Sequence, residues 1–282
     1  MAYITAASLI AVYAGYMLFQ EKFQVGWLGV FLTTAPFVAS VSWWTLSHSK
    51  PRTTASLTPY TVIAACGVAL ALWNSSQAPA QPDALLASGL ALAGFIAFLI
   101  YLYWYSYFGR QPSPALKIGE ALPAVDFEDG KGVRISSSSF LGNPALYLFY
   151  RGNWCPLCMA QIKEIAGQYQ EFAAREVAII LVSPQPHAHT RRLARKYDEP
   201  FHFLVDPGTV AAEALGIAAP GGLPAGLEVL GYATDTVLPT ALIVAADGTL
   251  IFADQTDNYR VRPKPETLLA VLDNQSTGVA TA

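Results

Sequence analysis

The first third of this 282-residue sequence contains very little charge. The chain carries 17 basic and 20 acidic side chains, and only five of them precede residue 109. These five are Glu21, Lys22, Lys50, Arg52 and Asp83. Charged residues make up 13% of the chain, against about a quarter in an average soluble domain. This deficit excludes a single water-soluble globule, a disordered chain, and a collagen-like or coiled-coil fibre.

Basic clusters and cysteines are also scarce. The part after residue 108 holds 14 basic and 18 acidic residues without any basic run, which argues against nucleic-acid binding. Three cysteines are too few for a disulfide-stapled scaffold. The chain therefore divides into an apolar first third and an ordinary, slightly acidic remainder.

Residues 1–109 contain four uncharged stretches of the length that crosses a bilayer, which takes about 17–25 residues. Aromatic side chains that favour the headgroup level gather at their ends. The four stretches are 2–19, 25–47, 57–73 and 84–108, and the aromatic residues are Trp43, Trp44, Trp73, Tyr101, Tyr103, Trp104, Tyr105 and Tyr107. This pattern predicts an α-helical transmembrane region of four helices in a lipid bilayer. The alternative is the buried aromatic core of a soluble helical protein; a cleavable signal peptide would need a basic segment before the first stretch.

The loop charges predict the orientation. With four spans, Lys50, Arg52, Arg110 and Lys117 lie on one side of the membrane and Lys22 lies alone on the other. The positive-inside rule then places the C-terminal domain on the cytoplasmic side of a bacterial-type inner membrane.

The remainder predicts one α/β domain with a central mixed sheet over residues 117–273, preceded by a linker at 110–116 and followed by a flexible tail at 274–282. The dipeptides Asp129-Gly130 and Asp247-Gly248 each predict a hairpin turn. Apolar runs predict buried strands at 145–150, 177–182 and 201–205.

The chemistry centres on Cys155-Pro156-Leu157-Cys158, which follows a predicted buried strand and begins a predicted helix. With Cys155 at the N-cap and Cys158 one turn later, a Cys155 thiolate would accept from the unpaired N–H groups of the helix start. We therefore expect Cys155 to be an exposed nucleophile and Cys158 to attack a mixed disulfide formed on it. Pro156 suits the first helical position, where no N–H is needed.

Three other readings of the cysteine pair remain open. The two cysteines could be unrelated buried residues, a structural disulfide, or half of a zinc site completed by His187 and His189. The sequence predicts no cofactor and no metal.

The run Phe149–Cys158 (FYRGNWCPLC) resembles the thioredoxin-like superfamily and, more narrowly, its peroxiredoxin-like AhpC/TSA branch. The resemblance covers about residues 117–273. Further matching stretches are Ile118–Pro123, Asp126-Phe127, Ser183-Pro184, Asp206–Gly208, Leu238–Thr240 and Asp247-Gly248.

The resemblance assigns roles to five further positions. It implies that Pro239 is cis and faces the redox pair, with Leu238 and Thr240 binding the extended backbone of a thiol partner. It implies that Trp154 shields one side of the sulfur and that Arg262 holds the thiolate. The alternatives are a trans proline at the start of an edge strand and an arginine of a surface loop.

The resemblance leaves two activities open. Peroxiredoxins carry their peroxidatic cysteine in a Pro-x-x-x-Thr/Ser-x-x-Cys pattern, whereas alignment on Cys158 puts Cys155 at the Thr position and Arg151 at the Pro position. We therefore expect a membrane-anchored thiol-dependent oxidoreductase that cycles a dithiol and a disulfide. Its partner would be a disulfide-containing protein or a peroxide; a non-catalytic thioredoxin-like binding or redox-sensing module is the alternative. The Gly- and Pro-rich segment 218–235 either covers the site or is a slack insertion.

Overall fold

The structure is a computed structural model that describes residues 2–20, 24–47 and 52–276. The chain forms two compact units. One comprises residues 1–49 and 53–108, and the other comprises residues 50–52 and 109–282. Arg52 therefore belongs to the second unit, although it lies between two helices of the first in the sequence.

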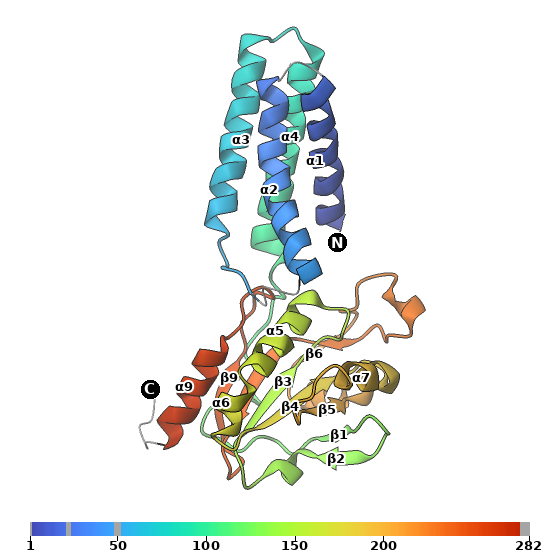
Figure 1. The fold of residues 1–282 in the computed structure, drawn as a ribbon, viewed down its shortest axis with the longest axis vertical. Coiled ribbons are helices and arrows are strands. Elements are labelled where there is room, and N and C mark those ends of the chain that lie inside the picture. The colour runs from blue at the N-terminus through green and yellow to red at the C-terminus, as the bar shows by residue number, and fades with distance from the viewer. Residues whose placement is uncertain (1, 21–23, 48–51, 277–282) are drawn as a thin grey trace. The chain divides into compact units, whose positions relative to one another are not determined.

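The first unit is a bundle of helices (Figure 1). They are α1 (Ala2–Gln20), α2 (Val25–Ser47), α3 (Thr58–Gln77) and α4 (Pro82–Ile100), and α4 continues into the π-helical turn η1 (Tyr101–Tyr105). Helix α2 packs against the other three. The buried core of the bundle includes Trp27, Val30 and Ala91, whereas large apolar side chains such as Phe19 and Leu46 point outward.

All four helices lie where the uncharged stretches predict them. Three of them, α1, α2 and α4 with η1, are long and apolar enough to cross a membrane, and α3 is not among these three. The prediction of a fourth span and the prediction of orientation therefore stay predictions. Lys22 and Lys50, on which the orientation partly depends, lie outside the described residues.

The second unit is built on a seven-stranded sheet in the order β2-β1-β5-β4-β3-β8-β9. Strands β3, β4 and β5 are parallel, while β1, β2, β8 and β9 add antiparallel pairs. The prediction of a mixed central sheet is thus confirmed. The strands are β1 (Asp126–Glu128), β2 (Arg134–Ser136), β3 (Ala145–Phe149), β4 (Ala178–Ser183), β5 (His202–Val205), β8 (Thr240–Val244) and β9 (Leu250–Asp254). Two short strands, β6 (Ala218–Ala219) and β7 (Thr236–Val237), form a separate ladder.

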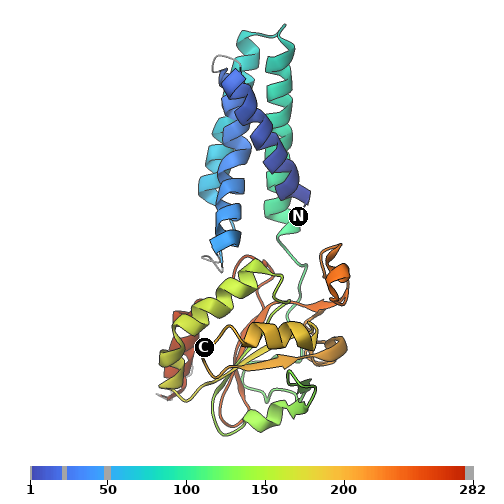
Figure 2. The same cartoon turned by 45° about the vertical axis from the view of Figure 1, so that its right-hand side comes forward.

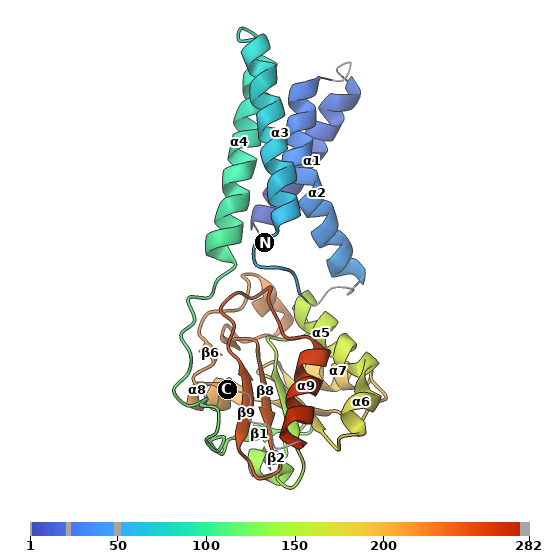
Figure 3. The same ribbon diagram turned by 90° about the vertical axis from the view of Figure 1, so that its left-hand side faces the viewer.

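Helices cover both faces of the sheet. Alternate residues of a strand point to opposite sides, so each face of the sheet has its own apolar core. Leu146 and Leu148 of β3 join the core under α5, α7 and α9, whereas Tyr147 and Phe149 join the core under α8. Helices α9 and α8 accordingly lie on opposite sides of β8 and β9 (Figure 3), and Figure 2 shows the sheet with helices packed against it. The helices are α5 (Pro156–Gly167), α6 (Tyr169–Ala173), α7 (His187–Ala194), α8 (Val210–Ala214) and α9 (Pro265–Ser276), with 3-10 turns η2 (Ser137–Phe140), η3 (Pro207–Thr209) and η4 (Leu227–Leu230).

Both predicted hairpins are confirmed, as β1–β2 and β8–β9. Two predicted boundaries change. The predicted linker 110–116 makes contacts within the α/β unit, because Arg110 and Ser113 donate their backbone N–H groups to Asp257 and Gln255 at 2.6 Å each. Helix α9 continues to Ser276, and the rest of the predicted tail lies outside the described residues.

Candidate functional site

The cysteine pair lies where β3 ends and α5 begins. Cys155 is the N-cap of α5, Pro156 is its first residue, and the backbone N–H of Cys158 points to the Cys155 sulfur at 3.4 Å. The predicted capping geometry is confirmed. A proline at the first helical position and a side chain that accepts an N–H at the third explain why the helix starts here.

Both sulfurs are free thiols and both are buried. Cys155 is 6% exposed and Cys158 is fully buried. The prediction that Cys155 is exposed is therefore wrong, and its predicted role as the nucleophile is not tested by its burial. N-cap side chains usually face solvent, but here Trp154, Leu157 and the apolar core between α5 and the sheet enclose the pair.

Arg262, in the segment between β9 and α9, points its guanidinium to the deeper cysteine. Its Nη2 lies 3.6 Å from the Cys158 sulfur and its Nη1 donates to Gln161 Oε1 at 2.8 Å. Arg262 is only 7% exposed, and Gln161 is buried one helical turn after Cys158 on α5. The structure thus brings the predicted Arg262 to the pair. The sequence analysis missed Gln161, which the spacing of three from Cys158 along a helix could have indicated.

The two thiols differ in acidity. Burial alone raises the pKa of the Cys158 thiol, but the hydrogen bond from Cys155 and the positive charges of Arg262 and Arg151 outweigh it and lower the pKa to about 5. The hydrogen bond that Cys155 makes to Cys158, together with burial, raises the pKa of the Cys155 thiol. The arrangement therefore favours a thiolate on Cys158 and a protonated Cys155 that donates to it, the reverse of the predicted roles.

Trp154 covers the approach to Cys155. The guanidinium carbon of Arg151 lies 4.8 Å from the centre of the Trp154 ring, within the range of a cation–π contact. Gly152 makes this arrangement possible, since its φ is +147° and a Cβ there would lie 2.6 Å from Trp154 Nε1. Backbone freedom at Gly152 therefore lets the indole fold back over the loop.

Gln185 holds the cysteine loop from the next strand of the sheet and was not singled out by the sequence analysis. Its side-chain oxygen accepts from Asn153 N–H at 2.8 Å, and its amide donates to Tyr150 and Thr190 at 3.0 and 3.1 Å. Gln185 is 2% exposed. A buried amide with three satisfied contacts fixes the loop against β4 and α7.

The Gly- and Pro-rich segment 218–235 packs against the site, which agrees with the interpretation that it covers the site. Arg151 donates to the carbonyl of Gly222, and the hydroxyl of Tyr232 donates to the side-chain oxygen of Asn153. Tyr232 also stacks on His189 with ring centres 4.6 Å apart. A cavity of about 10 Å³ remains beside Trp154 under this segment.

Pro239 does not have the predicted conformation, because no cis peptide bond occurs among the described residues. The chain here is fixed by its own contacts. The N–H of Leu238 donates to Ile217 O at 2.8 Å, and the Leu238 carbonyl accepts from the Thr240 hydroxyl at 2.8 Å. Both backbone groups of Leu238 are thus used within the chain, and the backbone is not presented to a partner as expected.

Thr240 is buried at 1% exposure, and its role in binding a partner stays a prediction. Its hydroxyl accepts from Arg110 Nη2 at 2.9 Å, and Arg110 Nη1 donates to the Pro239 carbonyl at 3.2 Å. Burial lowers the pKa of Arg110. Arg110 comes from the predicted linker and is a third residue, after Gln161 and Gln185, that the sequence analysis did not connect to the site.

The two histidines of the zinc reading have other contacts. His187 Nε2 lies 2.7 Å from Glu128 Oε2, and His189 Nε2 lies 3.1 Å from the Leu230 carbonyl. Across residues 2–20, 24–47 and 52–276, no three side chains of the metal-binding types form a cluster.

The second unit thus combines a mixed sheet with a cysteine pair at the start of α5, as the predicted thioredoxin-like resemblance expects. Residues 118–253 match the sequence model of the AhpC/TSA family. This match confirms the predicted resemblance for that part of the chain.

Curated relatives carry peroxiredoxin names. The chain is 29% identical to Peroxiredoxin Q, chloroplastic, of Populus jackii over 101 residues, which are 36% of this chain and 47% of the relative. It is 26% identical to Peroxiredoxin Bcp of Bacillus subtilis (strain 168) over 102 residues, which are 36% of this chain and 65% of the relative. The chain thus spans about half the length of the plant relatives. Among solved structures, Mycobacterium tuberculosis AhpC matches with a TM-score of 0.47 and 20% identity, covering 60% of this chain and 98% of that one.

Proposed function

We propose that this protein is a membrane-anchored thiol peroxidase in which Cys158 attacks the peroxide and Cys155 resolves the product. The observation that carries the proposal is the buried Arg262 guanidinium 3.6 Å from the Cys158 sulfur. A thiolate is the nucleophilic form of cysteine, and a fixed cation beside it favours that form. The AhpC/TSA match and the peroxiredoxin names of the relatives support a peroxide as substrate.

The reaction proceeds in three steps. The Cys158 thiolate attacks one peroxide oxygen, so that an S–O bond forms, the O–O bond breaks, and the leaving oxygen takes a proton and departs as water or an alcohol. The sulfur of Cys155 then attacks the Cys158 sulfenic acid, forming the disulfide while the hydroxyl and the Cys155 proton leave as water. Finally, an external dithiol supplies two electrons and restores both thiols.

The roles of the two cysteines follow from their surroundings. Cys158 has Arg262 beside it and a pKa lowered to about 5, whereas the pKa of Cys155 is raised. Cys155 lies one helical turn away and its sulfur already contacts the Cys158 N–H. A resolving cysteine this close would form the disulfide without a second protein chain.

Exchange with protein disulfides is the less favoured activity. Such exchange would use the backbone of Leu238 to bind an extended partner, and that backbone is occupied by Ile217 and Thr240. A peroxide is small enough to reach a buried sulfur, whereas a protein disulfide would require Trp154 and the segment 218–235 to move.

We also infer that the helical unit is a four-span anchor. Large apolar side chains cover its outer surface, among them Val12, Phe19 and Leu46 at 72%, 93% and 81% exposure. Arg52, which precedes α3, pairs with Glu164 inside the α/β unit, so residue 52 and residue 109 lie on one side of any membrane. An even number of crossings must separate them, and α3 therefore crosses if α4 does. The loop charges favour the cytoplasm for this side.

The test is oxidation of the reduced full chain by hydrogen peroxide, with Cys155→Ser and Cys158→Ser alongside. We expect the wild-type chain to react much faster than a free thiol and to form the Cys155–Cys158 disulfide. Cys155→Ser should keep the fast first step and accumulate a sulfenic acid on Cys158, detected by mass spectrometry with a sulfenic acid trap. Loss of the fast step in Cys155→Ser and its retention in Cys158→Ser would reverse the roles. Slow oxidation of all three proteins would overturn the peroxidase proposal.

A further inference from the structure

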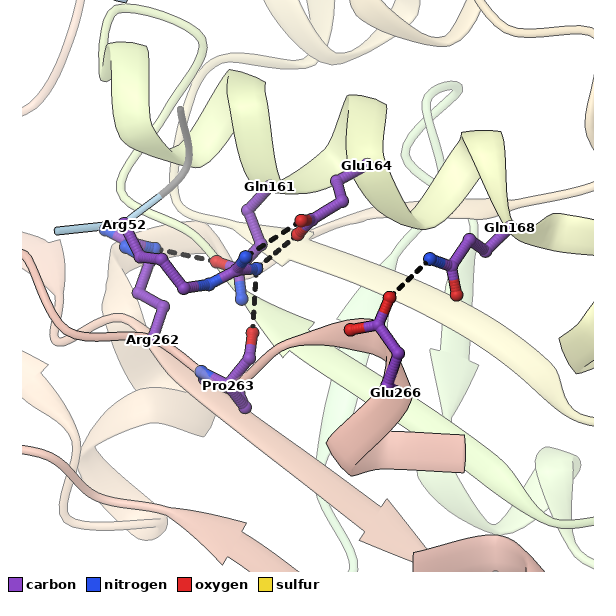
Figure 4. A network of polar contacts seen from close by, with 7 residues as sticks. All are labelled: Arg52, Gln161, Glu164, Gln168, Arg262, Pro263 and Glu266. Carbon is purple, nitrogen blue, oxygen red and sulfur yellow. Dashed lines mark hydrogen bonds and ion pairs between the residues drawn. The ribbon is translucent and has the colours of Figure 1, made fainter. Parts of the chain in front are cut away.

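The segment that carries Arg262 is fastened at three points to α5 and to Gln168, the residue that caps its C-terminus (Figure 4). Arg262 donates to Gln161, and Glu266 accepts from Gln168 at 2.8 Å. Between them lies a third connection, through Glu164. Positions 161 and 164 share one face of α5 with Cys158, which lies one turn before Gln161.

Arg52 makes the middle connection. Its Nη1 donates to Glu164 Oε1 at 2.8 Å, its Nη2 pairs with Glu164 Oε2, and its Nη2 donates to the Pro263 carbonyl at 3.0 Å (Figure 4). The guanidinium thus joins α5 directly to the residue that follows Arg262. The side chains of Arg52 and Glu164 are 18% and 29% exposed, and a bidentate pair shielded to this degree is stronger than an ordinary surface ion pair.

The segment after Arg262 has few other anchors. Pro263 and Pro265 have no backbone N–H and cannot donate a hydrogen bond. The Lys264 carbonyl is used by Thr267 and Leu268 at the start of α9. The Pro263 carbonyl is therefore the backbone group through which this segment is tied to α5, and Arg52 is its donor.

We propose that Arg52 is a positioning residue that holds the Arg262 guanidinium against the Cys158 sulfur by tying Pro263 to Glu164 of α5. The inference rests on the proposed role of Cys158 as the attacking sulfur. Arg52 contacts neither sulfur and acts through the placement of Arg262. It lies in the sequence between α2 and α3, 112 residues before Glu164, so a residue outside the family match would tune the reactive thiol.

Four charged or titratable side chains interact with the Cys158 sulfur. They are Arg262 from the 262–266 segment, Arg151 and Tyr150 from the end of β3, and Cys155 from the helix start. Arg52 is not among them. A change of the Cys158 pKa on altering Arg52 would therefore report movement of Arg262.

The test compares Arg52→Met and Glu164→Gln in the reduced full chain. The readout is the pH titration of far-ultraviolet thiolate absorbance, taken as the difference between each protein and the same protein with Cys158→Ser, so that tyrosines cancel. If Arg52 positions Arg262, both variants loosen the same connection and both raise the Cys158 pKa by about one unit. If charge alone acted through space, removing the cation would raise the pKa and removing the carboxylate would lower it. Glu164→Gln thus separates the two explanations by sign.

The matched control is Arg134→Met, which removes an exposed arginine paired with Asp126 on the β1–β2 hairpin. It should leave the titration unchanged. A lowered pKa in Glu164→Gln, or no shift in either variant, would overturn the positioning role. A wild-type Cys158 that titrates like a free thiol would instead overturn the proposed function. Should Arg52→Met fail to fold, Glu164→Gln alone still decides, since its two expected shifts have opposite signs.

Discussion

Arg262 Nη2 lies 3.6 Å from the sulfur of Cys158, and neither side chain is more than 7% exposed. A buried cation needs a partner, and Gln161 supplies only a neutral one. The Cys158 thiolate supplies a negative charge within hydrogen-bond distance of Arg262, and Asp254 adds a further negative charge. The arginine therefore stabilises the reactive form of the cysteine, and the thiolate in turn stabilises the buried arginine.

Replacing Arg262 should change the pH dependence of the reaction with peroxide. The wild-type rate constant should be flat above the Cys158 pKa of about 5 and fall tenfold per pH unit below it, because only the thiolate reacts. Arg262→Met should raise this pKa by about one to three units, so that the fall begins at higher pH. Stopped-flow oxidation across the pH range measures both profiles. Superimposable profiles would contradict the role of Arg262. The profile of Arg262→Lys, which keeps a positive charge, should lie between those of the wild type and Arg262→Met.

A second expectation concerns the backbone of the cysteine loop. Gly152→Ala adds a Cβ 2.6 Å from Trp154 Nε1 at a φ of +147°. Its control is Gly142→Ala, which has a φ of +100° and no heavy atom within 4 Å of the added Cβ. Backbone strain alone should cost each variant about 1–3 kcal/mol. Denaturant unfolding should show a larger loss for Gly152→Ala, together with altered Trp154 fluorescence; equal losses would mean that the indole moves aside freely.

A third expectation concerns the path of the chain through the membrane. If α3 and α4 both cross, the loop between them lies opposite the α/β unit. The exposed Cys66 is first replaced by alanine so that it does not react. A single cysteine is then introduced either in this loop (Ala80→Cys) or in the β1–β2 hairpin (Lys131→Cys). The two cysteines should react with a membrane-impermeant maleimide from opposite sides of sealed vesicles. Labelling from the same side would contradict the four-span topology.

Most of the fold could be predicted from patterns of neighbouring residues in the sequence. The capping of α5 by Cys155 could be predicted because it depends on four consecutive residues. The two hairpins could be predicted for the same reason, since Asp-Gly turns set their own geometry. The four helices of the first unit followed from the length of their uncharged runs.

The contacts that set the chemistry could not be predicted in this way. Burial of Cys155 depends on how Trp154 and the core close over it, and the conformation at Pro239 depends on Arg110 and Ile217. The family resemblance pointed to Arg262 but could not indicate its connection to Gln161. The contacts of Arg262 with Gln161 and of Arg110 with Pro239 join residues more than 100 positions apart. No pattern of neighbouring residues in the sequence indicates such a contact.

The α/β unit is discontinuous in sequence, and this matters for anyone who wishes to study it without its helices. A truncated protein that begins at residue 112 would retain both cysteines and the whole family match, yet it would lack Arg110 and Arg52. Glu164, Thr240 and the carbonyls of Pro239 and Pro263 would each lose a donor. Such a fragment would lack the proposed support for Arg262, and its thiol reactivity would underestimate that of the intact chain.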